Sequence, residues 1–276
     1  MRTKRLASVA VVALAVTAVY AQGGRGGQGG RGGQAPAAGA QDAKTVFYNM
    51  ANSLGMLRGL QEEDSITTLE FWANGTMNSG GQNYKLTNVR SSFNYAVPGL
   101  RLDMTRAGAD GKAQRVIEVV GGKYAWNETE PGLNATPLPA TYNDRLLRMW
   151  TVSSQGVVKA ARAAGANAKV TPQGGTTIVA FPAAGANFVV TLNAKNLIDK
   201  VQTTVGTNAP IETTFTDYGE LNDADYRADV FFPRRITQRQ GGTTLLDLTV
   251  TRTNTYNPYV IMPPPENVEK AGPAAK

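Results

Sequence analysis

A period of two in the hydrophobic pattern recurs along most of the chain and limits its fold more than any other feature. Residues 68–73, 85–95 and 100–105 each alternate between two sets of side chains, and glycine-containing breaks separate these runs. This period is typical of β-strands, because successive side chains of a strand point to opposite faces of the sheet. Gly121-Gly122 and Gly241-Gly242 each stand between two such runs and indicate tight hairpins. Further strands are expected over residues 114–120, 123–127, 168–171, 176–181, 188–192, 198–205, 211–218, 231–240 and 243–253.

Two regions follow a helical period instead. Apolar residues within 44–57 recur at helical spacing, and Asp42 precedes them as an N-terminal cap. Residues 143–165 predict two short helices, capped by Asn143-Asp144 and by Ser153-Ser154, with Gly165 ending the second. The helices are therefore grouped in two places between runs of strands.

These elements predict an α+β fold with one large antiparallel sheet of about eleven strands, as counted from the sequence pattern. Open sheets of that size tend to curl, and an apolar sheet face has to be covered. We therefore expect a strongly curled sheet, a half-barrel, with the helices covering its concave face.

The chain divides into four segments. A basic start, an apolar run of about 14 residues and a small residue at Ala21 predict a cleaved signal peptide over residues 1–21. The run is shorter than the ~20 residues of a membrane-spanning helix, so no stable membrane anchor is expected. Residues 22–42 are a Gly/Arg/Gln-rich tether that is expected to be disordered, and residues 43–258 form the domain. The Pro/Ala-rich tail, residues 259–276, is expected to be disordered too.

Histidine and cysteine are both absent from the sequence. Their absence excludes Ser-His-Asp and Cys-His catalysis, the usual zinc sites, thiol redox chemistry and disulfides. The functional classes that remain are catalysis by carboxylates, lysine or hydroxyl groups, and metal sites with oxygen ligands. We expect no cofactor.

The net charge argues against a nucleic-acid partner. It is +7 for the whole sequence but +3 from residue 43 onward, where 23 basic residues stand against 20 acidic ones. A domain so close to neutrality lacks the electrostatic footprint of a nucleic-acid-binding protein. The glycines and arginines of residues 22–42 could contact RNA, but a flexible tether is the favoured interpretation.

Two acidic stretches are candidate metal sites. Glu62-Glu63-Asp64 lacks the loop of alternating ligands and glycine that marks a dedicated calcium site, which favours a solvated connector. Asp223 and Asp225 precede a strand, where a turn with Asx hydrogen bonds is favoured over a calcium loop. No metal ligand is predicted.

Several short stretches resemble LolA/LppX-like lipoprotein-carrier domains. The stretches are Lys200-Val201, PIETTFTDY at 210–218, FPRRI at 232–236, QGG at 240–242, LDLTVT at 246–251, NDRLL at 143–147 with Trp150, GVVKAA at 156–161 and AWN at 125–127. More closely, they resemble the LolA-like N-terminal region of exported bacterial proteins that continue into a metallo-β-lactamase-fold hydrolase. The hydrolase half is absent from this sequence, and a His-rich metal site cannot form without histidine.

The resemblance extends over residues 42–254 and implies a bacterial protein exported to the periplasm, with secretion as the alternative. It also implies a partner: a hydrophobic ligand or the acyl chains of a lipoprotein. A concave sheet face that is only partly filled would leave an apolar cavity for such a ligand. The alternative for each candidate residue is packing in the core under the helices. The candidate cavity residues are Phe71, Phe93, Tyr95, Leu100, Leu102, Met104, Trp126, Trp150, Phe188 and Phe231.

Three functions are consistent with these observations. The favoured one is a non-catalytic binding or carrier protein for a lipid, lipoprotein or other hydrophobic ligand. The second is an accessory or scaffold domain for a separately encoded exported enzyme, which would then be a protein partner. A hydrolase that uses carboxylates alone ranks below both, because nothing in the sequence places two carboxylates across a cleft.

Overall fold

The computed structural model describes residues 42–222 and 229–273, all within one compact unit. The predicted signal peptide and all but the last residue of the predicted tether lie outside the described residues. Within the described part, a 13-stranded sheet carries most of the chain, and every neighbouring pair of its strands is antiparallel. The expected antiparallel sheet is therefore confirmed, with more strands than the eleven expected.

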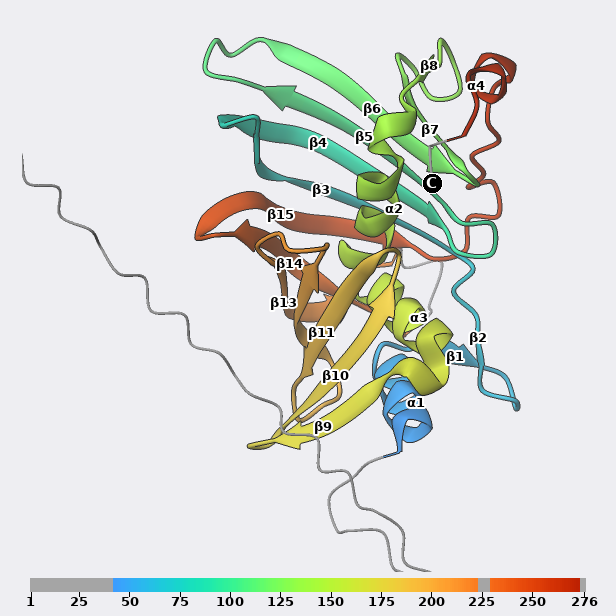
Figure 1. Ribbon diagram of the computed structural model, residues 1–276, viewed down its shortest axis with the longest axis vertical. Helices are drawn as coiled ribbons and strands as arrows, with labels where there is room; N and C mark the ends of the chain where they lie inside the picture. The colour runs from blue at the N-terminus through green and yellow to red at the C-terminus, as the bar shows by residue number, and fades with distance from the viewer. Residues whose placement is uncertain (1–41, 223–228, 274–276) are drawn as a thin grey trace, which may run out of the picture. The chain divides into compact units, whose positions relative to one another are not determined.

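The sheet consists of two meanders joined in the middle (Figure 1). The first contains β3 (Thr68–Ser79), β4 (Gln82–Asn94), β5 (Gly99–Ala107), β6 (Ala113–Gly121), β7 (Tyr124–Glu128) and β8 (Thr136–Pro137). The second contains β9 (Lys169–Gln173), β10 (Thr176–Ala183), β11 (Ala186–Leu192), β12 (Ile198–Thr204), β13 (Ile211–Glu220), β14 (Phe231–Gln240) and β15 (Thr243–Asn254). Because β3 pairs with β15, the first and last strands of the sheet along the chain meet at its centre, and β8 and β9 form its two edges. A separate ribbon pairs β1 (Leu57–Arg58) with β2 (Glu63–Asp64).

Helix α1 (Ala43–Ser53) begins at the predicted cap, where the Asp42 carboxylate accepts a hydrogen bond from the Thr45 backbone N–H at 3.3 Å. Helix α1 ends earlier than expected, because the chain turns after Ser53 into the β1–β2 ribbon. Helix α3 (Ser154–Ala164) has the predicted Ser153 cap and ends at Gly165. The cap predicted at Asn143-Asp144 is wrong: α2 (Tyr142–Thr151) begins after a 3-10 turn at Pro139–Thr141 and has no side-chain cap.

Helices α2 and α3 connect the two edges of the sheet and lie across one of its faces (Figure 1). We call this the inner face. Alternate side chains of the strands point toward the helices and form one continuous hydrophobic core with α1, α2 and α3. In the described part of the chain, no helix is long and apolar enough to cross a membrane.

The outer face, on the other side of the sheet, is covered in one place by the C-terminal segment. Val260, Met262 and Val268 are buried there against Ile117 and Trp126. Val268 lies in α4 (Glu266–Ala271), which contacts β7 and β8. The tail was expected to be disordered, and for residues 259–273 that prediction is wrong, because these apolar side chains pack on the sheet.

Candidate functional site

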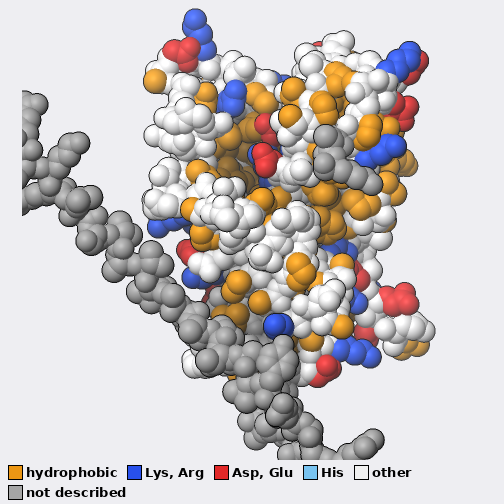
Figure 2. Space-filling model, in the orientation of Figure 1, with side chains coloured by type: hydrophobic (Ala, Val, Ile, Leu, Met, Phe, Trp, Pro, Cys, Tyr) orange, Lys and Arg blue, Asp and Glu red, His pale blue; other side chains and the backbone are white. Residues whose placement is uncertain are grey.

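A cavity of about 440 Å³ opens on the inner face between the sheet and α2. Its floor is the inner row of β3, β4 and β5, from Phe71 and Val89 to Leu100, Leu102 and Met104. Figure 2 shows hydrophobic side chains gathered in a hollow on this side of the molecule. These residues share a face because their strands alternate in register, so that Val89 pairs with Met104 and Ser91 with Leu102.

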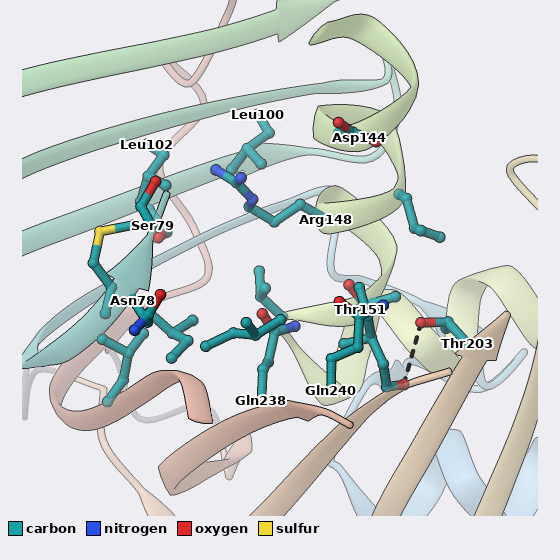
Figure 3. Close-up of a pocket in the computed structure, with 18 of the residues that line it drawn as sticks. Asn78, Ser79, Leu100, Leu102, Asp144, Arg148, Thr151, Thr203, Gln238 and Gln240 are labelled. Carbon is teal, nitrogen blue, oxygen red and sulfur yellow. Dashed lines mark hydrogen bonds between the residues drawn. The ribbon is translucent and has the colours of Figure 1, made fainter. Parts of the chain in front are cut away.

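Helix α2 supplies one wall of the cavity. Asp144, Leu147, Arg148 and Thr151 all line it, and they follow the i, i+3, i+4, i+7 spacing of a single helix face. Figure 3 shows Asp144 and Arg148 on this helix, with Leu100 and Leu102 on the strands across from them. The same spacing is visible in the sequence, where it predicts a helix capped by Asn143-Asp144 but no cavity wall.

The opposite wall comes from the second meander. Leu246 and Leu248 of β15 contribute apolar surface, while Gln238 and Gln240 of β14 contribute amides. Thr203 of β12 lies beside them in Figure 3, with its hydroxyl donating to the Ile211 carbonyl at 3.4 Å. The cavity therefore has an apolar floor and a wall with polar groups at intervals, which is the usual make-up of a small-molecule site.

Four of the ten residues proposed from the sequence line this cavity: Phe71, Leu100, Leu102 and Met104. All four come from β3 and β5, and Phe71, Leu100 and Met104 are nearly inaccessible from outside. The structure thus brings together the members of the predicted set that lie on the floor.

Four others lie on the inner side of the sheet but outside the cavity, and one of them, Trp150, belongs to α2 itself. Phe93 packs between Phe71 and Tyr95, at ring-centroid distances of 5.9 and 5.8 Å, and Tyr95 meets Trp150 at 5.8 Å. Phe188 stacks on Phe181 at 5.0 Å under the second half of the sheet. These residues belong to the packed core, which was the stated alternative for each of them.

The remaining two, Trp126 and Phe231, are on the other face. Trp126 pairs with Val119 on the outer row, and its ring is buried under the C-terminal segment. Phe231 is 40% exposed, whereas the next residue, Phe232, is buried against Phe71 at 5.4 Å. Their placement in the predicted cavity is therefore corrected, because a shift of one residue along a strand moves a side chain to the opposite face.

Arg148 and Glu118 form an ion pair at the cavity wall. The Arg148 guanidinium donates a short hydrogen bond from Nη1 to the Glu118 carboxylate on β6. Burial acts to raise the pKa of Glu118, but the positive charges of Arg148 and Arg145 outweigh it and lower the pKa below its usual value. A negative charge is therefore stabilised at this wall.

A second polar cluster gathers at the start of α3 and bears on hydroxyl or lysine catalysis. The Ser153 hydroxyl lies 2.8 Å from the Tyr95 hydroxyl, and the Lys159 ammonium lies 5.1 Å from the centre of the Tyr95 ring. Ser153 is fully buried and caps α3, and Lys159 donates to the Asp64 carboxylate at 2.6 Å. These contacts join α3 to β2 and to the end of β4, which is a structural role.

Of the two acidic stretches, only Glu62-Glu63-Asp64 lies in the described part of the chain. Asp64 is within ion-pair distance of Lys159 and Arg162, at 2.6 and 3.7 Å. Asp223 and Asp225 lie outside the described residues. Over residues 42–222 and 229–273, no three acidic side chains lie close enough together to hold a metal ion.

Comparison with known proteins gives no family for this chain. It matches no model of a protein family, and it matches no curated protein.

Proposed function

We propose that this protein is an exported, non-catalytic carrier or binding protein for a lipid, the acyl chains of a lipoprotein or another hydrophobic ligand. The cavity of about 440 Å³ is the observation that carries the proposal. Its volume lies within the ~300–1,000 Å³ range of small-molecule sites, and its floor is apolar. The periplasm is the proposed location, with secretion as the alternative.

The hydrophobic effect gives such a site enough binding energy for a lipid. Each CH₂ group moved from water to an apolar surface contributes about 0.8 kcal/mol, so a single alkyl chain that fills the cavity needs few polar anchors. The floor residues Leu100, Leu102 and Met104 provide that surface.

We propose further that the fold is a LolA-like half-barrel. The order of the strands supports this proposal, because the α2–α3 segment runs from the edge strand β8 to the edge strand β9 and lies across the inner face of an open sheet. In such an arrangement the helices form one wall of a cavity and the strands form its other walls. The contacts of the cavity with α2, with β3–β5 and with β12–β15 fit that description.

The test is to purify the full chain from the periplasm of an expressing bacterium. Native mass spectrometry and lipid extraction would detect a ligand that accompanies the protein, and titration with the neutral dye Nile red would measure apolar binding. We expect a bound lipid or saturable dye binding. A protein that carries no lipid and binds no dye would refute the carrier proposal. Recovery of the same protein in complex with an exported enzyme would then favour an accessory domain.

A matched pair of variants locates the binding. Leu102→Trp places an indole in the cavity, whereas Thr105→Trp, on the same strand, points to the outer face. We expect Leu102→Trp to weaken dye binding at least tenfold and Thr105→Trp to leave it unchanged. Equal effects of the two variants would place the dye elsewhere.

A further inference from the structure

The charges around the cavity are concentrated on one side of it. Arg148 and Asp144 line it from α2, and Glu118 on β6 pairs with Arg148. Arg145, on the same helix, is buried behind them and donates to the carbonyls of Val119 and Trp126 at 3.0 and 2.5 Å. Its remaining hydrogen bond goes to the side-chain oxygen of Asn127 at 2.6 Å.

Among the described residues, the hydrogen bonds of Arg145 thus all go to neutral oxygens, and no carboxylate there is bonded directly to its positive charge. A guanidinium stays protonated in proteins, and its field is stronger where water is excluded. The lowered pKa of Glu118 reports the same field, since that carboxylate is held in its charged form despite its burial. Arg106 on β5 adds a third positive charge that acts on Glu118.

Arg148 also retains hydrogen-bonding capacity. Of its five N–H donors, the structure places one against Glu118, within the described part of the chain. Its side chain remains 33% exposed beside the apolar floor. A fork of this kind matches the two oxygens of a carboxylate or phosphate.

We propose that the cavity selects amphiphiles with an anionic head group, whose alkyl chain lies on the β3–β5 floor and whose anion binds the Arg148 guanidinium. The proposal rests on the proposed function and adds the class of ligand. The head group either binds Arg148 together with Glu118 or displaces the Glu118 carboxylate from Arg148. An uncharged amphiphile of the same length would bind through its chain alone.

The experiment compares dodecanoate with 1-dodecanol by displacement of Nile red from the full-length protein at pH 8, where the fatty acid is ionised. A hydrogen bond to a charged group contributes enough to predict at least a tenfold preference for dodecanoate. Arg148→Gln is expected to remove most of that preference, because it weakens the binding of dodecanoate and not the binding of dodecanol. Arg148→Lys, which keeps the charge but not the fork, is expected to retain part of it. Arg235→Gln, which removes an arginine paired with Asp247 away from the cavity, is the control and should change neither affinity.

The outcomes separate the two levels of the proposal. Equal affinities of the natural protein for dodecanoate and dodecanol would overturn the anionic head group and leave the carrier proposal standing. Binding of neither compound would refute the carrier proposal itself. Inorganic phosphate at the same concentrations should displace no dye, and displacement equal to that by dodecanoate would indicate a simple anion site. Glu118→Gln should strengthen dodecanoate binding, because it removes the competing carboxylate, and a weaker affinity would contradict the exchange at Arg148.

Discussion

Met262 of the C-terminal segment packs directly on Gly121 of β6, in a space that only a glycine leaves open. A Cβ atom at Gly121 would lie 2.5 Å from the Met262 carbonyl oxygen and 3.1 Å from the Trp126 ring. Gly99, the cross-strand partner of Gly121, would place a Cβ 3.1 Å from the Met262 sulfur. Gly99 and Gly121 therefore leave the space on the outer face in which Met262 of the tail packs.

Substituting Gly121 with alanine should release the tail. The added methyl group overlaps the backbone carbonyl oxygen of Met262, which cannot rotate away, so we expect a loss of about 1–3 kcal/mol in the free energy of unfolding. Hydrogen exchange should also become faster over residues 259–271. Ala113→Val, an addition of similar kind at the exposed start of β6, is the control. If hydrogen exchange over residues 259–271 were unchanged in the Gly121→Ala variant, the contact between Met262 and Gly121 would not be what holds the tail.

Asn257 anchors the beginning of the same segment. Its side-chain amide donates to the buried Glu70 carboxylate at 2.7 Å, and its carbonyl accepts from the Thr68 hydroxyl at 3.0 Å. Asn257→Ala leaves one oxygen of Glu70 without this donor, and we expect it to lower the free energy of unfolding by about 1–3 kcal/mol. Urea denaturation measures the change. Asn83→Ala, at an exposed hairpin, should cost well under half as much, and similar losses would argue against the anchoring role.

The tail also shows where amino-acid composition gives a wrong prediction of disorder. Prolines and alanines between residues 262 and 275 predict disorder, yet the side chains of Val260, Met262 and Val268 are buried against the sheet. The signal for this contact is divided between two distant places: the tail itself and the glycines at 99 and 121. Neither place indicates the other along the chain. The contact could therefore be recognised only once β5 and β6 were paired.

The strands themselves were predictable, since the period of two is a local property of the sequence. Which row of each strand faces inward was not, because that depends on the register of the whole sheet. Trp126 and Phe231 illustrate the difference: both lie in predicted strands and both are on the outer row. Arg148 and Asp144 were missed for another reason, because a polar stripe on a helix usually faces water and only the tertiary structure shows that this one faces a cavity.

Phe71 and Phe188 allow cavity binding to be separated from core stability. Both rings are buried on the inner face, but only Phe71 lines the cavity. Phe71→Leu and Phe188→Leu should each lower the free energy of unfolding by about 1–3 kcal/mol. Only Phe71→Leu should also change the affinity for Nile red, by at least threefold. A change of equal size in both variants would mean that the dye responds to stability and not to the cavity floor.

The Arg148–Glu118 pair should make stability depend on pH in a defined direction. The pKa of Glu118 is lower in the folded protein than its ordinary value of 4.5, so the folded state favours the carboxylate. The stabilisation that comes from the ionised Glu118 is fully present above the pKa of Glu118 in the unfolded chain. It is lost as the pH falls through the pKa of Glu118 in the folded protein. Glu118→Gln removes this titration. The difference in free energy of unfolding between the natural protein and Glu118→Gln should therefore be constant from pH 8 to about pH 5.5 and shift against the natural protein below about pH 4.5. Urea denaturation at a series of pH values measures it. A difference that stays constant down to pH 3, with both proteins folded, would show that Arg148 and Arg145 do not stabilise the charge on Glu118.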